Sequence, residues 1–175
     1  MAYLVTVDKF VPDEPDSRVD VVLSEEVEAI GPAAFRFSNE VRSVRATEAL
    51  RTIGDNAFDG CRNLAEAVFP GAVEYLGKRA FQHCTSLREI SFADALTVVG
   101  DASFQGCTSL AAASLPGVVA LERYAFQRCT DLVEVTWGNI ESIGRRAFAN
   151  CSSLVRLSFP KTLKTIGEEA FSGCA

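Results

Sequence analysis

The stretch Ile53–Cys61, which reads IGDNAFDGC, recurs along the chain in closely similar form. The other copies are IGPAAFRFS (Ile30–Ser38), LGKRAFQHC (Leu76–Cys84), VGDASFQGC (Val99–Cys107), LERYAFQRC (Leu121–Cys129), IGRRAFANC (Ile143–Cys151) and IGEEAFSGC (Ile166–Cys174). Their phenylalanines are 22 or 23 residues apart, at Phe35, Phe58, Phe81, Phe104, Phe126, Phe148 and Phe171. Repetition at one such period is typical of a solenoid, in which each unit stacks on its neighbours. We therefore expect these phenylalanines to form one continuous core.

The first half of each unit predicts a short strand. In the unit Cys84–Phe104, Ile90 and Phe92 alternate with Ser91. An alternation of period two is typical of a strand with one buried face and one open face. Proline follows this strand in three units, where its missing N–H disfavours further pairing: Pro70, Pro116 and Pro160.

The second half of each unit predicts a short helical turn that brings the chain back. Leu96, Val99 and Ser103 are spaced by three and four residues, as on one face of a helix. Glycine precedes the cysteine in three copies, where a left-handed residue can close a helix: Gly60, Gly106 and Gly173. Glu122 interrupts the separate glycine column that follows Ile53 and its equivalents, so we expect no obligatory positive φ in that column.

Composition and charge limit the partners. The chain has 175 residues, of which 48% are hydrophobic and 23% charged, as in an ordinary globular protein. A net charge of −6 disfavours binding to duplex nucleic acid and to anionic membrane surfaces. No apolar run reaches the roughly 18 residues of a membrane span, and the first residues lack the pattern of a secretory signal. We therefore predict no nucleic-acid partner, no membrane partner and a cytoplasmic location.

The cysteines share one position, the last of the nine-residue stretch: Cys61, Cys84, Cys107, Cys129, Cys151 and Cys174. No C-x-x-C pair is present, so the local spacing of a zinc site is missing. Ser38 occupies the same position in the first copy. We interpret the six as buried free thiols that pack as small apolar side chains. Disulfides between neighbouring units are the alternative, if stacking brings the Cα atoms to about 4.4–6.8 Å.

The repeated pattern L-x-x-I-x-x-P-x-x-[LV]-x-x-I-G-x-x-A-F-x-x-C resembles the BspA-like leucine-rich repeat, from about Val21 to Cys174. The resemblance implies an α/β leucine-rich-repeat solenoid with short parallel strands on the concave side and short helical turns on the convex side. It also implies a binding rather than a catalytic role. Such repeats occur in bacterial surface adhesion proteins, so the cell surface is the alternative location.

Two regions are predicted along the chain. Residues 1–20 form an N-terminal capping strand and linker, in which Tyr3–Val11 alternates like a strand. Residues 21–175 form the solenoid of about seven units. The chain ends on FSGCA without the polar cap that solenoids usually carry, so we expect a fragment or self-association through the C-terminal end.

Catalytic and metal-binding chemistry finds little support. His83 is the single histidine and precedes Cys84, but sequence neighbours rarely point at each other. Histidine-based catalysis and a multi-histidine metal site are therefore excluded, and we predict no enzyme, no metal and no cofactor. Asn150–Ser152 matches a glycosylation sequon, which we interpret as part of the repeat. Basic residues of the turns, such as Arg145 and Arg146, are interpreted as a solvated face.

The open side of the predicted strands is the candidate binding face. Its charged positions are the candidate site residues: Arg42, Arg45, Glu66, Arg88, Glu89, Glu134 and Arg156. The leading hypothesis is a non-enzymatic module that binds a protein partner through this concave face. The rival hypothesis is a structural or self-assembling segment of a longer repeat protein. A third reading treats the face as a neutral scaffold surface, with any binding site elsewhere.

Overall fold

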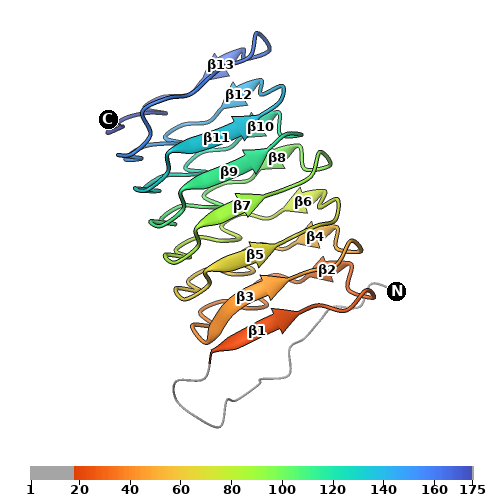
Figure 1. Ribbon diagram of the computed structural model, residues 1–175. Helices are drawn as coiled ribbons and strands as arrows, with labels where there is room; N and C mark the ends of the chain where they lie inside the picture. The colour runs from red at the N-terminus through yellow and green to blue at the C-terminus, as the bar shows by residue number, and fades with distance from the viewer. Residues whose placement is uncertain (1–17, 175) are drawn as a thin grey trace.

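The computed structural model describes residues 18–174, which form a solenoid of short strands joined by turns (Figure 1). Each repeat contributes one layer, which in all but the last consists of a longer strand, a two-residue strand and the turn that follows. The longer strands form the long-strand sheet: β1 (Val19–Val22), β3 (Val41–Arg45), β5 (Glu66–Val68), β7 (Glu89–Ser91), β9 (Ala112–Leu115) and β11 (Glu134–Trp137). The two-residue strands form the short-strand sheet: β2 (Ala29–Ile30), β4 (Thr52–Ile53), β6 (Tyr75–Leu76), β8 (Val98–Val99), β10 (Ala120–Leu121), β12 (Ser142–Ile143) and β13 (Thr165–Ile166).

All strand pairs are parallel and follow the register of the repeat, with one shift between Val19 and Asp20 where β1 pairs with β3. On β9 and β11, for example, Ala113 pairs with Val135 and Leu115 pairs with Trp137. The predicted strand in the first half of each unit is confirmed for six layers. The segment that precedes β13, around Leu157, carries no assigned strand. The capping strand predicted at Tyr3–Val11 lies outside the described residues.

The predicted helical turns are wrong, because residues 18–174 contain no helix. The returning half is a two-residue strand followed by consecutive turns, and its N–H groups alternate between two uses. The Phe58 N–H donates to the Ala80 carbonyl of the next layer at 2.7 Å, whereas the Asp59 N–H donates within its own turn to Asn56. Since every second N–H is committed to the neighbouring layer, the i→i−4 ladder of an α-helix cannot form.

Left-handed residues shape these turns. Asn56 and Gly60 have φ values of 55° and 74°, and the same two positions are left-handed in the other described turns. The left-handed conformation predicted for Gly60 is thus confirmed, although no helix precedes it. A Cβ atom at Gly60 would lie 2.3 Å from the ring of Phe37 in the layer before, which explains why glycine follows a bulky residue there. The expectation for Glu122 also holds, because its column shows no positive φ.

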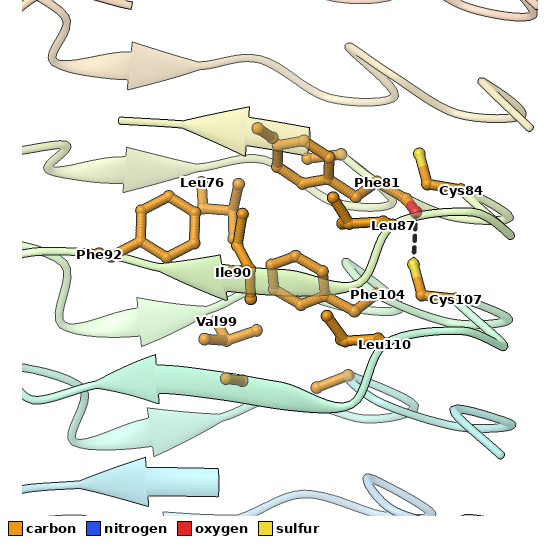
Figure 2. Packing of buried hydrophobic residues seen from close by; sticks show 14 of the residues in the cluster. Leu76, Phe81, Cys84, Leu87, Ile90, Phe92, Val99, Phe104, Cys107 and Leu110 are labelled. Carbon is orange, nitrogen blue, oxygen red and sulfur yellow. Dashed lines mark hydrogen bonds between the residues drawn. The ribbon is translucent and has the colours of Figure 1, made fainter. Parts of the chain in front are cut away.

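The phenylalanines form the predicted spine. Neighbouring rings of Phe35, Phe58, Phe81, Phe104, Phe126, Phe148 and Phe171 are stacked, with centroids 5.0–5.4 Å apart. Five of these side chains are fully buried, and Figure 2 shows Phe81 above Phe104 within the layers of the core. Each ring inside the stack is shielded from water on both faces, one by the ring of the layer before and one by the ring of the layer after. The stability of each layer therefore depends on its neighbours.

The cysteine thiols lie behind this spine and join its layers. The Cys107 thiol donates to the Phe81 carbonyl at 3.0 Å, as the dashed line in Figure 2 marks, and the other five repeat this contact at 2.8–3.2 Å. All six thiols are free, and only Cys174 is more than marginally exposed. Burial raises the pKa of Cys61, Cys107 and Cys151 to about 12. They are thus protonated donors at neutral pH.

One interface between layers differs from the rest. No hydrogen-bonded pairing joins β5 to β7 or β6 to β8, whereas parallel pairing links the other neighbouring strands of the two sheets. The turns remain joined there, since the Phe81 N–H donates to the Ser103 carbonyl at 2.8 Å. We call this interface the seam.

Candidate functional site: the outer face of the long-strand sheet

A groove of about 1050 Å³ follows the outer face of the long-strand sheet. Its lining comes from β5, β7, β9 and β11 and from the residues that flank β5 and β7, so one end of it lies over the seam. The strand alternation turns Ile90 and Ala113 into the core and leaves Glu89 and Ala112 on the outside. Small side chains on β9, Ala112 and Ser114, leave the middle of the groove open.

The groove gathers four of the seven predicted site residues: Glu66, Arg88, Glu89 and Glu134. All four are exposed. Within residues 18–174, no ion pair is formed by Arg88, Glu89 or Glu134, whereas Glu66 accepts from the guanidinium of Arg45 at 3.1 Å. Unpaired charged groups on an open face are available to a partner at no cost in broken contacts.

The two N-terminal arginines of the prediction are engaged within the fold. Arg42 donates to Asp20 through two nitrogens, one of them at 3.0 Å, and the Ser43 hydroxyl donates to the same carboxylate at 2.6 Å. The hydrogen bond from the Arg42 guanidinium holds the pKa of Asp20 below its usual value. Neither Arg42 nor Arg45 lines the groove. These two residues therefore form ion pairs between adjacent layers and are not free to bind a partner.

The seventh predicted residue, Arg156, lies in a second hollow of about 910 Å³ near the C-terminal end. This hollow also contains the exposed side chains of Val133 and Val155 and the stacked pair Trp137–Phe159, whose rings lie 5.8 Å apart. Strand alternation places both valines on the open face of the sequence prediction and Trp137 and Phe159 on its inward side, but none of the four is among the predicted site residues. Aromatic groups with apolar neighbours are common anchors of protein interfaces.

Three basic residues of the turns, Arg123, Arg145 and Arg146, form ion pairs, whereas Lys78, Arg79 and Arg128 form none within residues 18–174. Arg123 contacts Asp101 at 2.8 Å and Arg145 contacts Glu168 at 3.2 Å, in each case across one layer boundary. The eight ion pairs formed by arginine or lysine within residues 18–174 join residues 21 to 23 positions apart. The ion pairs on the turn side therefore join neighbouring layers.

His83 and Cys84 do not form a reactive pair. The His83 ring is exposed, and its Nδ1 lies 3.8 Å from Oδ1 of the buried Asp59. The Cys84 thiol is directed instead to the Phe58 carbonyl at 3.1 Å, and burial raises its pKa well above the ordinary value. A thiolate nucleophile activated by this histidine is therefore absent from the geometry.

Two further properties bear on ligands. Within residues 18–174, no three His, Cys, Asp or Glu side chains are close enough to hold a metal ion together. The same part of the chain has no helix of the length and apolar character that a membrane crossing requires.

Solved structures share this architecture. A leucine-rich repeat protein from Eubacterium ventriosum is 27% identical with a TM-score of 0.83, and the match covers 89% of this chain but 42% of that one. A leucine-rich repeat protein from T. pallidum is also 27% identical with a TM-score of 0.60, over 84% of this chain and 80% of that one. A leucine rich cell surface protein from Faecalibacterium prausnitzii is 21% identical with a TM-score of 0.61, over 90% and 58%, which shows the common fold.

No curated protein matches the chain. The model of the BspA type leucine rich repeat region matches residues 16–133 and 119–175, with six copies of the repeat. These matches cover nearly the whole sequence and follow the layers described above. The chain therefore belongs to the BspA type leucine-rich repeat family.

Proposed function

We propose that this protein is a non-enzymatic repeat module that binds another protein through the outer face of its long-strand sheet. The groove over β5 to β11 is the observation that carries this proposal. Exposed charged and hydroxyl side chains line it, and these side chains contribute nothing to the core.

The solenoid suits such a role physically. Its layers are fixed by the phenylalanine spine, so the face is ordered before a partner arrives and little conformational entropy is lost on binding. Extended surfaces of this kind are the usual binding sites of repeat proteins.

The proposal is tested by filling the groove. Ala112 lies in the middle of the groove and is half-buried, so Ala112→Trp places a large side chain where a partner would sit. Ala120 is the matched control, because it is a half-buried, outward residue of β10 in the short-strand sheet. The immobilised wild-type protein is used to select ligands from a phage-displayed random 12-residue peptide library. The selected peptides are then measured against both variants.

We expect the selected peptides to lose binding to Ala112→Trp and to keep binding to Ala120→Trp. Circular dichroism and thermal unfolding of both variants check that each is folded. Peptides that bind both variants equally, or that are lost only with Ala120→Trp, would contradict the long-strand face as the binding surface.

We also propose a second candidate, a self-assembling or structural segment of a longer array, because the last described layer exposes its core positions. Ile166 is 52% exposed, whereas its equivalent Ile143 is 2% exposed. Phe159 is 41% exposed and Phe171 is half-buried. Another layer, from a second copy or from further repeats, would cover these side chains.

This second candidate predicts a concentration-dependent dimer. Multi-angle light scattering of the wild-type protein is compared with Ile166→Lys, which places a charge on the open end. We expect dimers of the wild-type protein and monomers of the variant. A wild-type protein that stays monomeric at millimolar concentration argues against self-association.

The location is part of the proposal. Six free thiols agree with the cytoplasm, where cysteines are kept reduced, while the family resemblance implies the cell surface. Protease treatment of intact producing cells, followed by immunoblotting, distinguishes the two, because only a surface protein is digested.

A further inference from the structure

We infer that the groove takes an extended, cationic peptide segment that runs across the strands, along the axis of the solenoid. This inference rests on the proposed protein-binding function and names the chemistry of the partner. Three features of the groove carry it: its charge, the spacing of its carboxylates and the hydroxyl groups beside them.

The charge of the groove is negative. Three carboxylates line it, those of Glu66, Glu89 and Glu134, against the single guanidinium of Arg88. Glu66 is already satisfied by Arg45, but Glu89 and Glu134 have no cationic partner within residues 18–174. Complementary charge across an interface selects the partner and speeds its encounter, so the free carboxylates favour lysine or arginine side chains.

The two free carboxylates lie in one column along the axis, two strands apart. Glu89 pairs with Ala112 on the next strand, and Ala112 pairs with Glu134 on the strand after. Two strand spacings of about 4.8 Å separate them by roughly 10 Å. A polyproline II segment repeats every three residues, over about 9.3 Å. Basic side chains three residues apart on such a segment therefore meet both carboxylates, with Ala112 leaving space for the backbone between them.

Hydroxyl groups follow the same direction in the neighbouring column. Ser91 pairs with Ser114, and Ser114 pairs with Thr136, and all three line the groove. A hydroxyl both donates and accepts, so this column can satisfy the N–H and carbonyl groups of an extended backbone, which has no internal hydrogen bonds of its own.

A lone metal cation does not explain the arrangement. No group of three potential ligands is close enough to hold a metal ion within residues 18–174. Carboxylates separated by two strands match several positive charges on one chain rather than a single ion.

The test uses two fluorescein-labelled nonapeptides, (Lys-Pro-Pro)₃ and (Glu-Pro-Pro)₃, and fluorescence anisotropy at 50 mM and 300 mM NaCl. The first probe carries lysine every third residue in a segment that favours polyproline II, and the second differs only in the sign of its charge. The groove variant is Glu89→Gln with Glu134→Gln. The control variant, Glu48→Gln with Glu122→Gln, removes the same charge from two exposed carboxylates that do not line the groove.

We expect the lysine peptide to bind the wild-type protein, more weakly at the higher salt concentration, and the glutamate peptide not to bind. The groove variant should bind the lysine peptide about 2- to 30-fold more weakly, the range for two solvent-exposed ion pairs, while the control variant binds like the wild type. Equal binding of both peptides, or equal effects of the two double variants, would overturn the inference.

The outcomes separate this inference from the proposed function. If library peptides are lost with Ala112→Trp but are not basic, the long-strand face binds a partner and the cationic assignment is wrong. If the lysine peptide binds Ala112→Trp and Ala120→Trp equally, its site lies outside the groove. The inference that the groove binds a cationic segment is then wrong.

Discussion

The turns and the sheets cross the seam differently. On the turn side, the hydrogen bond from Phe81 to Ser103, the stacked rings and the Cys107 thiol all span it. On the strand side, the ladder stops between β5 and β7 and between β6 and β8. The turns and the phenylalanines therefore join the layers even where strand pairing is absent, so an interruption in a sheet does not separate the stack.

One end of the groove lies over the seam, where strand pairing is interrupted. Its lining includes β5 on one side of the seam and β7 on the other. Most of the groove is therefore fixed, because parallel pairing joins β7 to β9 and β9 to β11, and only its β5 side is held by the turns without strand pairing. The four predictions that follow test the difference, beginning with the largest expected effect.

Alkaline pH tests the turn side without any substitution. A thiol with an ordinary pKa near 9.0 ionises in the unfolded chain, whereas the Cys61, Cys107 and Cys151 thiols have a pKa of about 12 in the folded protein. The stability from these thiols is therefore complete below pH 9 and is lost progressively between about pH 9 and 12, because the unfolded state releases its protons first.

We expect urea denaturation midpoints to fall steeply over this range, by more than any single substitution below. The variant Cys107→Ala with Cys129→Ala should lose less stability between pH 8 and 11 than the wild type. Identical pH profiles for the two proteins would show that the buried thiols do not control alkaline unfolding.

The spine predicts the largest effect of a single substitution. Phe104 is fully buried between the rings of Phe81 and Phe126, so Phe104→Ala should lower the free energy of unfolding by about 3–5 kcal/mol. Phe171→Ala, which removes a half-buried ring at the end of the stack, should cost about half as much. Chemical denaturation measures both. A loss below about 1 kcal/mol for Phe104→Ala would mean that the spine does not hold the layers.

Two equivalent glycines compare an ordinary interface with the seam. A Cβ atom at Gly77 would lie 2.4 Å from the backbone nitrogen of Asp55, whereas at Gly100 the nearest atom is the Leu76 carbonyl oxygen at 3.1 Å. Gly77→Ala should therefore destabilise the protein by about 1–3 kcal/mol, and Gly100→Ala by less than about 1 kcal/mol. Thermal unfolding of both variants checks this, and equal losses would contradict the looser packing at the seam.

Hydrogen exchange should show the smallest effect, because it reports one missing backbone hydrogen bond at the seam. The N–H groups of Glu74 and Val119 donate to the preceding layer at 2.8 Å, but the equivalent N–H of Thr97, at the seam, makes no such backbone hydrogen bond. We expect the protection factor of Thr97 to be about tenfold lower than those of Glu74 and Val119. Phe81, on the turn side of the same seam, should stay protected. Uniform protection at all four amides would show that the sheets are continuous.

Much of this fold could be predicted because the period of the repeat is visible in the sequence. Each phenylalanine needs a neighbour on both faces, so a 22- or 23-residue period in the sequence already implies stacked layers. The same argument placed Cys107 and its equivalents inside, where the structure has them. The outward position of Glu89 and Glu134 followed from strand alternation in the same way.

The helical turns were a wrong prediction for a physical reason. Spacings of three and four residues arise in an α-helix and also in a series of turns with local i→i−3 hydrogen bonds. Only the partner of the alternate N–H groups distinguishes the two, and that partner lies in the next layer, as Ala80 does for Phe58. No local window of sequence contains it.

By itself, then, the sequence determined the period, the stacked core and the side of each strand that faces outward, because these depend on apolar spacing within one unit. The tertiary structure alone decided which charges on that face are free, since Arg42 and Arg45 find their carboxylates in adjacent layers. It also decided where the sheets part, because the strength of an interface depends on how two whole layers fit together.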